Sequence, residues 1–256
     1  MNYMSEYQIG EQIAKGEKTS VFRGTDETGN SVIIKLLRKE YANPENIARF
    51  KKEYELITSI DSDYVIKATG LVKHENSLMM VMEDFKGKTL KEYLNEHAPV
   101  TDKKQIKSVL NVAKIIAMAL EDIHNHNIVH KDINSTNILI NPYIHEIKII
   151  DFGLATQVAD ETVEDQSNVF EGTYAYISPE QTGRLNRNID YRSDYYSLGI
   201  TLYELFSGRL PFRSESPREW IHSHIARDPV QLSQIHPDIP DCVNDVFMKL
   251  MEKSPE

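Results

Sequence analysis

Two aspartates and an asparagine in the middle of the chain have types and spacing that could bind a cation or handle a proton. Asp132 and Asn137 lie in the segment His130-Lys131-Asp132-Ile133-Asn134-Ser135-Thr136-Asn137. Asp151 opens Asp151-Phe152-Gly153, fourteen residues after Asn137. Taken alone, Asp132 could be a turn residue and Asn137 a helix cap. The joint spacing of the three residues is what indicates a site.

A lysine at the end of an apolar run is the second chemical signal. Lys35 closes Val32-Ile33-Ile34-Lys35, and burying an unpaired ammonium group is costly. A lysine that extends its charge to solvent at a strand edge is the ordinary interpretation. The next predicted helix offers Glu53 as a partner. Glu53 borders an apolar helix face, and Glu55 fits less well. The apolar residues on that face are Leu56, Ile57 and Ile60.

The first 82 residues are predicted to form short strands around one helix. Turn residues at 26–30 favour a hairpin, because Gly29 and Asn30 tolerate positive φ. The helix begins at Asn43-Pro44 and continues with apolar residues near a 3.6-residue spacing. The predicted strands cover residues 7–13, 20–23, 31–37, 65–72 and 78–82.

After the polar connector 83–88 the pattern becomes helical. The longest predicted helix, 104–124, has a continuous apolar stripe, and Gly208 is a predicted C-cap for the helix 191–207. Further helices are predicted at 90–97, 217–225 and 241–252, and short apolar segments at 128–133, 138–140 and 147–150. The order predicts an α+β fold with a small β-rich lobe, a connector and a larger α-rich lobe.

Bulk composition indicates a globular domain. The chain has 256 residues, of which 40% are hydrophobic and 27% charged. A net charge of −10 argues against broad nucleic-acid binding. The single cysteine, Cys242, favours a reducing, cytoplasmic compartment. We see neither a signal peptide nor a membrane-inserting segment. The histidines at 124, 126 and 130 are interpreted as a helix end rather than a metal cluster.

One more segment completes a known pattern, Glu171-Gly172-Thr173-Tyr174-Ala175-Tyr176-Ile177-Ser178-Pro179-Glu180. Together with the segments above, it resembles the protein kinase superfamily, and most closely its serine/threonine branch. The resemblance covers nearly the whole chain. It implies a bilobal protein-kinase-like fold over 1–256, with an N-lobe of about 1–82, a hinge of about 83–88 and a C-lobe of about 89–256. ATP and Mg²⁺ are the implied cofactors, and a protein is the implied substrate.

The resemblance also implies roles for single residues. Asp132 would accept the substrate's hydroxyl proton, Lys35 would grip the ATP phosphates, and Asn137 and Asp151 would ligate Mg²⁺. His130 and Phe152 would support the site by packing. The implied catalytic residues are Asp132, Lys35 and Asn137. The implied ATP-binding residues are Ile13, Ala14, Gly16, Val21, Ile33, Lys35, Glu53, Met82, Glu83 and Phe85.

Four departures from the kinase pattern keep a second interpretation open. Only Gly16 remains of three glycines in the phosphate loop. Ile33 would narrow the adenine pocket, and Asn134 stands where a lysine is usual. Lys131 replaces an arginine and cannot offer its bidentate fork. The alternative is therefore a pseudokinase that acts as a nucleotide-binding or interaction module. A small-molecule kinase on a related fold fits less well with the segment 173–180.

A narrower resemblance concerns residues 130–134 and 179–184. These segments are similar to the N-terminal kinase-like domain of large bacterial multidomain sensor proteins that carry histidine-kinase modules. Such proteins would supply further domains as partners. In the family Glu180 pairs with a later arginine, and none follows Arg227, so we expect the domain to continue past residue 256. Thr162 and Ser167 are predicted phosphorylation sites, and Thr173 is expected to contact Asp132.

Overall fold

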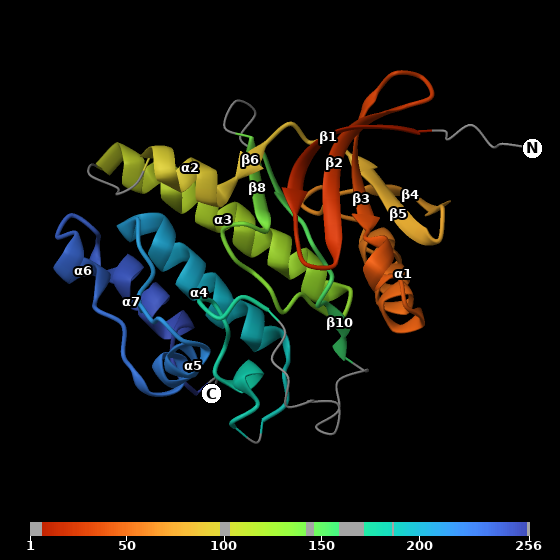
Figure 1. The fold of residues 1–256 in the computed structure, drawn as a ribbon. Coiled ribbons are helices and arrows are strands. Elements are labelled where there is room, and N and C mark those ends of the chain that lie inside the picture. The colour runs from red at the N-terminus through yellow and green to blue at the C-terminus, as the bar shows by residue number, and fades with distance from the viewer. Residues whose placement is uncertain (1–6, 98–102, 142–145, 159–171, 186, 255–256) are drawn as a thin grey trace, which may run out of the picture. The chain divides into compact units, whose positions relative to one another are not determined.

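The protein folds into two compact units, residues 1–86 and 87–256, coloured by residue number in the ribbon of Figure 1. The structure is a computed structural model that describes residues 7–97, 103–141, 146–158, 172–185 and 187–254. Thr162 and Ser167 lie outside the described residues. The predicted α+β class is confirmed, because the first unit is built on a β-sheet with one α-helix and the second is mainly helical.

The first unit is a five-stranded antiparallel sheet with the strand order β1-β2-β3-β5-β4. Its strands are β1 (Tyr7–Lys15), β2 (Thr19–Asp26), β3 (Ser31–Leu37), β4 (Ala68–His74) and β5 (Ser77–Glu83). One face of β3 and β5 forms a buried apolar cluster of Val32, Ile34, Met79 and Val81. The opposite face of the same strands carries Lys35.

Two local signals start the first unit's turn and helix as predicted. The carboxylate of Asp26 accepts hydrogen bonds from the backbone N–H groups of Thr28 and Asn30, both at 2.9 Å. Gly29 has a φ of 85° in that turn, which glycine adopts without strain. Helix α1 (Pro44–Ser59) begins after Asn43, whose side chain caps the N–H of Asn46. A short 3₁₀ turn, Lys39–Tyr41, precedes it.

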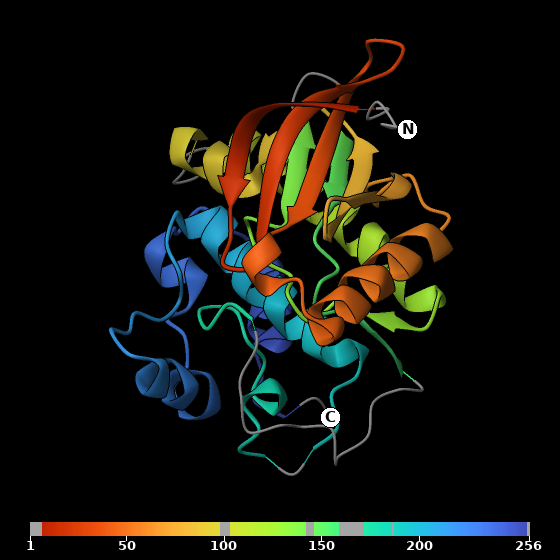
Figure 2. The same cartoon turned by 45° about the vertical axis from the view of Figure 1, so that its right-hand side comes forward.

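The second unit is organised around α4 (Tyr191–Ser207). From Ser193 onward, every residue of this helix except Tyr195 is buried. Figure 2 shows α4 between α3 (Lys103–Asn125) and α7 (Asp241–Leu250), and it contacts both. Gly208 ends α4 with a φ of 72°, as the C-cap prediction requires. The other helices are α2 (Leu90–His97), α5 (Pro217–Ala226) and α6 (Leu232–Ile235).

Short strands hold the polar segments of the second unit. β6 (Lys88–Thr89), β8 (Ile138–Asn141) and β9 (Glu146–Ile149) form one sheet, and β7 (Ile128–Val129) pairs with β10 (Thr156–Gln157). The segment 130–137 runs from β7 to β8, and Asp151 follows β9. A strand therefore precedes each polar segment and fixes where it starts.

Element boundaries agree with the sequence prediction for some elements and differ by a few residues for others. β3, α2 and α4 have the predicted limits, whereas β4 starts at Ala68 instead of residue 65 and α7 ends at Leu250 instead of 252. The short elements β6, β10 and α6 have too few residues for a periodic pattern. Among the residues described by the structure, no helix has both the length and the apolar character needed to cross a membrane.

Candidate active site

Lys35 and Glu53 form a buried ion pair in the first unit. Lys35 Nζ lies 2.6 Å from Glu53 Oε1, and the two residues are only 8% and 5% exposed. Each charge therefore compensates the desolvation of the other. Glu53 projects from the buried side of α1, as its apolar spacing indicates, while Glu55 is exposed. The pair fixes an ammonium group on the sheet face that carries Lys35.

Strand register places five of the predicted nucleotide-binding residues on that same face. Ala14 is opposite Val21 on β1 and β2, and Val21 is opposite Lys35. Ile33 lies two residues before Lys35 and is opposite Met82 on β5. Directly paired residues, and residues two apart along a strand, point to one side of a sheet. Ala14, Val21, Ile33, Lys35 and Met82 therefore line one surface, opposite the apolar cluster.

The glycine-poor loop closes as a hairpin without further glycines. Gly16 N–H donates to the carbonyl oxygen of Thr19 at 2.9 Å, and β1 and β2 pair up to Lys15 and Ser20. A side chain at position 16 would meet nothing closer than Thr19, at 3.6 Å. Ile13, Ala14 and Gly16 are exposed in this hairpin. The exposed hairpin could thus cover a bound ligand, although it carries side chains at most positions where the kinase pattern has glycine.

The segment after β5 is anchored by its own carboxylates. Glu83 Oε1 accepts the backbone N–H of Lys67 at 2.9 Å. Asp84 accepts hydrogen bonds from Ser31 at 2.7 Å and from Arg23 at 3.1 Å. These bonds lower the pKa of the Asp84 carboxyl against the opposing effect of burial. Phe85 follows, partly buried.

In the second unit, Asp132 is held by two amide side chains. Asn134 Nδ2 donates to Asp132 Oδ1 at 3.1 Å, and Asn137 Nδ2 donates to Asp132 Oδ2 at 2.8 Å. Asn137 Nδ2 also donates to the Asp132 carbonyl oxygen at 2.9 Å. These bonds fix the carboxylate while leaving it lone pairs that can still accept a proton. The two asparagines thus make Asp132 a positioned acceptor.

Asn134 connects Asp132 to Thr173. Its Oδ1 accepts the backbone N–H groups of Thr136 at 2.9 Å and Asn137 at 3.2 Å, which turns its Nδ2 towards Asp132. Nδ2 also lies 3.4 Å from Thr173 Oγ1. The expected direct contact between Thr173 and Asp132 is therefore replaced by a link through Asn134. The sequence showed only a missing positive charge at this position, and the structure shows a polar bridge.

Asp194 anchors the segment that contains Asp132, a role that was not predicted from the sequence. It is fully buried in α4. Its Oδ2 accepts the backbone N–H of His130 and its Oδ1 that of Lys131, both at 2.8 Å. His124 Nε2 lies 2.9 Å from Oδ2. The available signal was a carboxylate inside a predicted helix rich in apolar residues, since a buried carboxylate needs internal partners.

Two residues with positive φ stand beside the candidate catalytic groups. Lys131 has a φ of 66° and Asp151 one of 63°, a region that side chains other than glycine seldom adopt. His130 and Phe152 are buried and pack with their ring centroids 4.7 Å apart. His130 Nε2 lies 3.1 Å from the carbonyl oxygen of Ile150. Ring packing and hydrogen bonds to the backbone thus surround Lys131 and Asp151, the two residues with a strained backbone at the candidate site.

Gln181 connects the Ser178-Pro179-Glu180 segment to the segment 130–137, which contains Asp132. Gln181 Nε2 donates to the Lys131 carbonyl oxygen at 2.8 Å, and its Oε1 accepts the Ser178 N–H at 3.0 Å. Glu180 is buried and accepts a hydrogen bond from Ser193 at 2.5 Å. Gln181 was also missed, because nothing in the local pattern distinguishes it from a surface glutamine.

The side-chain oxygens of Asn137 and Asp151 are of the type that could hold a cation together with a phosphate group. Asn137 uses its amide N–H groups on Asp132, and no described residue donates to its Oδ1. Asp151 is exposed. Within the described ranges, no three His, Cys, Asp or Glu side chains gather where they could hold a metal ion alone. Mg²⁺ in phosphate-binding enzymes commonly takes one or two protein oxygens and completes its shell with phosphate and water.

Comparison with known proteins identifies the family. The protein kinase domain family matches residues 7–256. A serine/threonine-protein kinase of Bacillus subtilis, PrkC, is 34% identical over 252 residues, which cover 97% of this chain and 38% of the relative. A probable serine/threonine-protein kinase of Clostridium perfringens is 33% identical over 98% of this chain and 36% of the relative. PknB of Mycobacterium leprae, a serine/threonine-protein kinase, is 30% identical over 98% and 40%.

This chain therefore spans about two fifths of the length of these relatives, which are 38%, 36% and 40% covered. The family match nevertheless extends over almost the whole of it and includes both structural units. The chain belongs to the protein kinase family.

Proposed function

We propose that this chain transfers the γ-phosphoryl group of ATP to serine or threonine hydroxyls of proteins. The observation that carries the proposal is the Asp132 carboxylate, fixed by hydrogen bonds from Asn134 at 3.1 Å and Asn137 at 2.8 Å. A carboxylate held in this way can orient a hydroxyl and accept its proton. The serine/threonine-kinase names of the relatives support the same activity.

The remaining groups would bind the nucleotide. Lys35 would bind the α- and β-phosphate oxygens, and Glu53 would keep its ammonium group in place. Asp151 and the Oδ1 atom of Asn137 would hold Mg²⁺, whose charge would offset the negative charge of the phosphates. Little covalent chemistry is then required of the protein, since phosphoryl transfer depends mainly on positioning and charge stabilisation.

We propose that the adenine binds against the sheet face formed by Ala14, Val21, Ile33 and Met82. The backbone of Glu83 and Phe85 would meet its polar edge, with residues 83–88 as the hinge. Ile13 and Gly16 would belong to the cover over the phosphates. The register of β1, β2, β3 and β5 supports this surface, because it places those side chains on one side of the sheet.

The pseudokinase alternative is not favoured. Every titratable or ligating group that phosphoryl transfer needs is present, and the relatives are named as kinases. Asn134 removes one positive charge, but it adds a hydrogen-bonded bridge to Asp132 and Thr173. The departure therefore alters the site without removing its proton acceptor.

The wider context of the chain remains a set of predictions. The relatives do not support the resemblance to histidine-kinase sensor proteins, because their names describe serine/threonine kinases. The cytoplasmic location rests on the single cysteine, and the exclusion of nucleic-acid partners rests on the net charge of −10.

The test has two stages. Calorimetry with ATP, with and without Mg²⁺, should show Mg²⁺-dependent binding that Asp151→Ala weakens and the exposed-residue control Asp238→Ala does not. A radiolabel assay with a mixed serine/threonine peptide pool should then show transfer that Asp132→Asn reduces by roughly 10²-fold or more. Binding without any transfer would favour the nucleotide-binding module. Undiminished transfer by Asp132→Asn would overturn the catalytic assignment.

A further inference from the structure

A pocket in the second unit carries more positive than negative charge. It has a volume of about 260 Å³ and lies between α2, the end of α4 and the following segment up to α5. Its charged lining residues are Lys91, Glu204, Arg209 and Arg213, and its aromatic ones are Phe212 and Trp220. Three cations and one carboxylate leave a formal charge of +2, on a chain whose net charge is −10.

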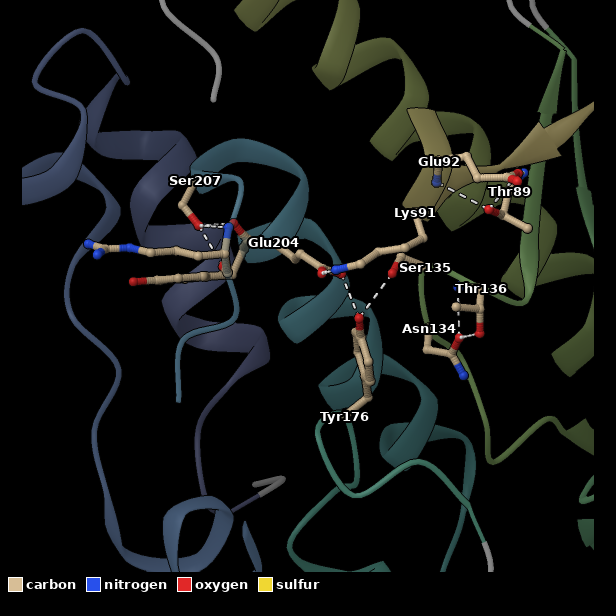
Figure 3. A network of polar contacts seen from close by, with 11 residues as sticks. Thr89, Lys91, Glu92, Asn134, Ser135, Thr136, Tyr176, Glu204 and Ser207 are labelled. Carbon is tan, nitrogen blue, oxygen red and sulfur yellow. Dashed lines mark hydrogen bonds and ion pairs between the residues drawn. The ribbon is translucent and has the colours of Figure 1, made fainter. Parts of the chain in front are cut away.

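The one carboxylate of the pocket is already used. Glu204 is 1% exposed, and Figure 3 shows both of its oxygens engaged. Lys91 Nζ lies 2.5 Å from Oε1, and the Tyr176 hydroxyl donates to Oε2 at 2.6 Å. Burial and the charge of Glu204 raise the pKa of Tyr176, so this hydroxyl keeps its proton. Glu204 therefore offers no open acceptor to an incoming cation.

The two arginines of the pocket are available. Both are exposed, and no described residue accepts a hydrogen bond from the guanidinium group of Arg209 or Arg213. The backbone of Arg209 is fixed by Ser207, whose hydroxyl bonds to its N–H and carbonyl groups at 3.3 and 2.7 Å. Guanidinium groups match carboxylate and phosphate oxygens in a bidentate geometry. The pocket thus presents two exposed guanidinium groups to an anion, beside the aromatic rings of Phe212 and Trp220.

Hydrogen bonds connect this pocket to the segment that holds Asp132. The hydroxyl of Tyr176, which binds Glu204, also lies 2.9 Å from Ser135 Oγ. The backbone N–H of Lys91 donates to the Ser135 carbonyl oxygen at 2.8 Å. Ser135 is three residues after Asp132, so the network joins the pocket to the segment that carries Asp132. Figure 3 labels its members Lys91, Glu204, Tyr176 and Ser135. Residues that line the pocket or bind its carboxylate are therefore bonded to the same short segment that carries Asp132.

We propose that this pocket selects substrates that carry an anionic side chain close to the phosphorylated residue, with Arg209 and Arg213 as the groups that read it. The inference rests on the proposed kinase activity. The anion is a carboxylate of aspartate or glutamate, or the phosphate of a residue phosphorylated earlier. Their shared chemistry is a planar or tetrahedral set of oxygens that guanidinium groups bind.

The experiment compares peptides with one acceptor serine and with glutamate, phosphoserine, glutamine or arginine scanned through each flanking position. The 256-residue chain should prefer the glutamate peptide over its glutamine match by roughly three- to tenfold in kcat/KM at one position, as expected for two exposed ion pairs. The preference should shrink as salt is raised. A larger preference for phosphoserine would identify phosphate as the natural group, and equal or lower preference would identify a carboxylate.

A charge-matched pair of variants assigns the effect to the pocket. Arg209→Gln/Arg213→Gln should abolish the preference while glutamine peptides react at the wild-type rate. Arg218→Gln/Arg227→Gln removes two exposed arginines outside the pocket lining and should keep the preference. Absence of any acidic preference in the wild type, or its survival in the first variant, would overturn the proposal.

Binding separates this proposal from the kinase assignment. Fluorescence anisotropy measures binding of the same peptides with alanine in place of the acceptor serine, so it does not depend on phosphoryl transfer. Tighter glutamate-peptide binding that Arg209→Gln/Arg213→Gln removes supports the pocket even if no peptide is phosphorylated. In that case only the proposed activity fails. Equal binding of glutamate and glutamine peptides, with transfer intact, rejects the pocket alone.

Discussion

Asp194 accepts the backbone N–H of Lys131 at 2.8 Å from a fully buried position in α4. Lys131 has a φ of 66°, so this bond helps to hold a conformation that lysine seldom adopts. The same carboxylate accepts the N–H of His130. A helix of the second unit thus determines the backbone path immediately before Asp132.

Asp194→Asn should therefore lower both stability and activity. An asparagine offers one acceptor oxygen and turns an N–H₂ group towards a backbone donor, so one buried N–H loses its partner. We expect the free energy of unfolding in urea to fall by about 2–4 kcal/mol, and transfer to fall with it.

Asp238→Asn is the matched control, because Asp238 is exposed in the same unit. It should behave as the wild type in both assays. A stable Asp194→Asn protein with full activity would show that the loop before Asp132 is held by other contacts.

The pair of Lys35 and Glu53 should show strong coupling in a double-mutant cycle. Lys35→Met removes the cation that lies against the buried Glu53 carboxylate, and Glu53→Gln removes the negative charge that lies against the Lys35 ammonium group. Either single change should cost about 3–5 kcal/mol in unfolding free energy, whereas the double variant should recover part of that loss. Urea unfolding measures stability, and calorimetry measures the expected loss of ATP binding in Lys35→Met.

Lys51→Met serves as the control for this cycle, since Lys51 is exposed on the same helix as Glu53. It should change stability by less than about 0.5 kcal/mol. Additive single effects would mean that the 2.6 Å contact contributes nothing specific to the stability of the first unit.

Asn134→Ala should reduce the rate of transfer more than the affinity for ATP. The change removes an acceptor for two backbone N–H groups and a donor to Asp132. We expect a loss of about 1–2 kcal/mol in stability and a fall in kcat of roughly tenfold or more as Asp132 loses orientation. Steady-state kinetics separate kcat from the KM for ATP.

The exposed Asn188→Ala provides a reference for Asn134→Ala. A rise in the KM for ATP with unchanged kcat would place the role of Asn134 in nucleotide binding rather than in positioning Asp132.

Local patterns were sufficient for the parts of the site that lie on long regular elements. Lys35 follows an apolar run on β3, and Glu53 is on the apolar side of a helix with a clear 3.6-residue period, so the local spacing was enough to predict their pairing. Val21 is opposite Lys35 across the β2–β3 hairpin, whereas Met82 comes opposite Ile33 through the non-local pairing of β3 with β5. Periodicity fixes the face of each residue once the strands are paired.

Long-range contacts and backbone strain could not be read from the sequence. Asp194 and Glu204 act on residues 63 and 113 positions earlier, and no local pattern states which partner a buried carboxylate will find. The positive φ of Lys131 accompanies such a contact, its backbone bond to Asp194, and neither the lysine nor the aspartate at 151 is a residue type that requires a positive φ. The bridging role of Asn134 was hidden for the same reason, since it depends on Thr173.

The stability of the second unit should fall in mild acid because of His224. Burial, together with the nearby charge of Lys253, lowers the pKa of His224 from 6.5 to about 3. Its ring is fully buried, with Nδ1 at 3.0 Å from the Tyr196 hydroxyl. Below pH 6.5 the unfolded chain binds a proton that the folded chain refuses until about pH 3, so stability decreases as the pH falls through that range.

His224 should account for a loss of up to roughly 2 kcal/mol between pH 6.5 and 5. Urea unfolding of His224→Gln should be less sensitive to acid by that amount, because glutamine does not titrate. His222→Gln alters an exposed histidine on the same helix and should retain the wild-type dependence. If His224→Gln lost stability as steeply as the wild type, the buried ring would have to accept a proton in the folded state at ordinary pH, and the acid sensitivity would belong to carboxylates elsewhere.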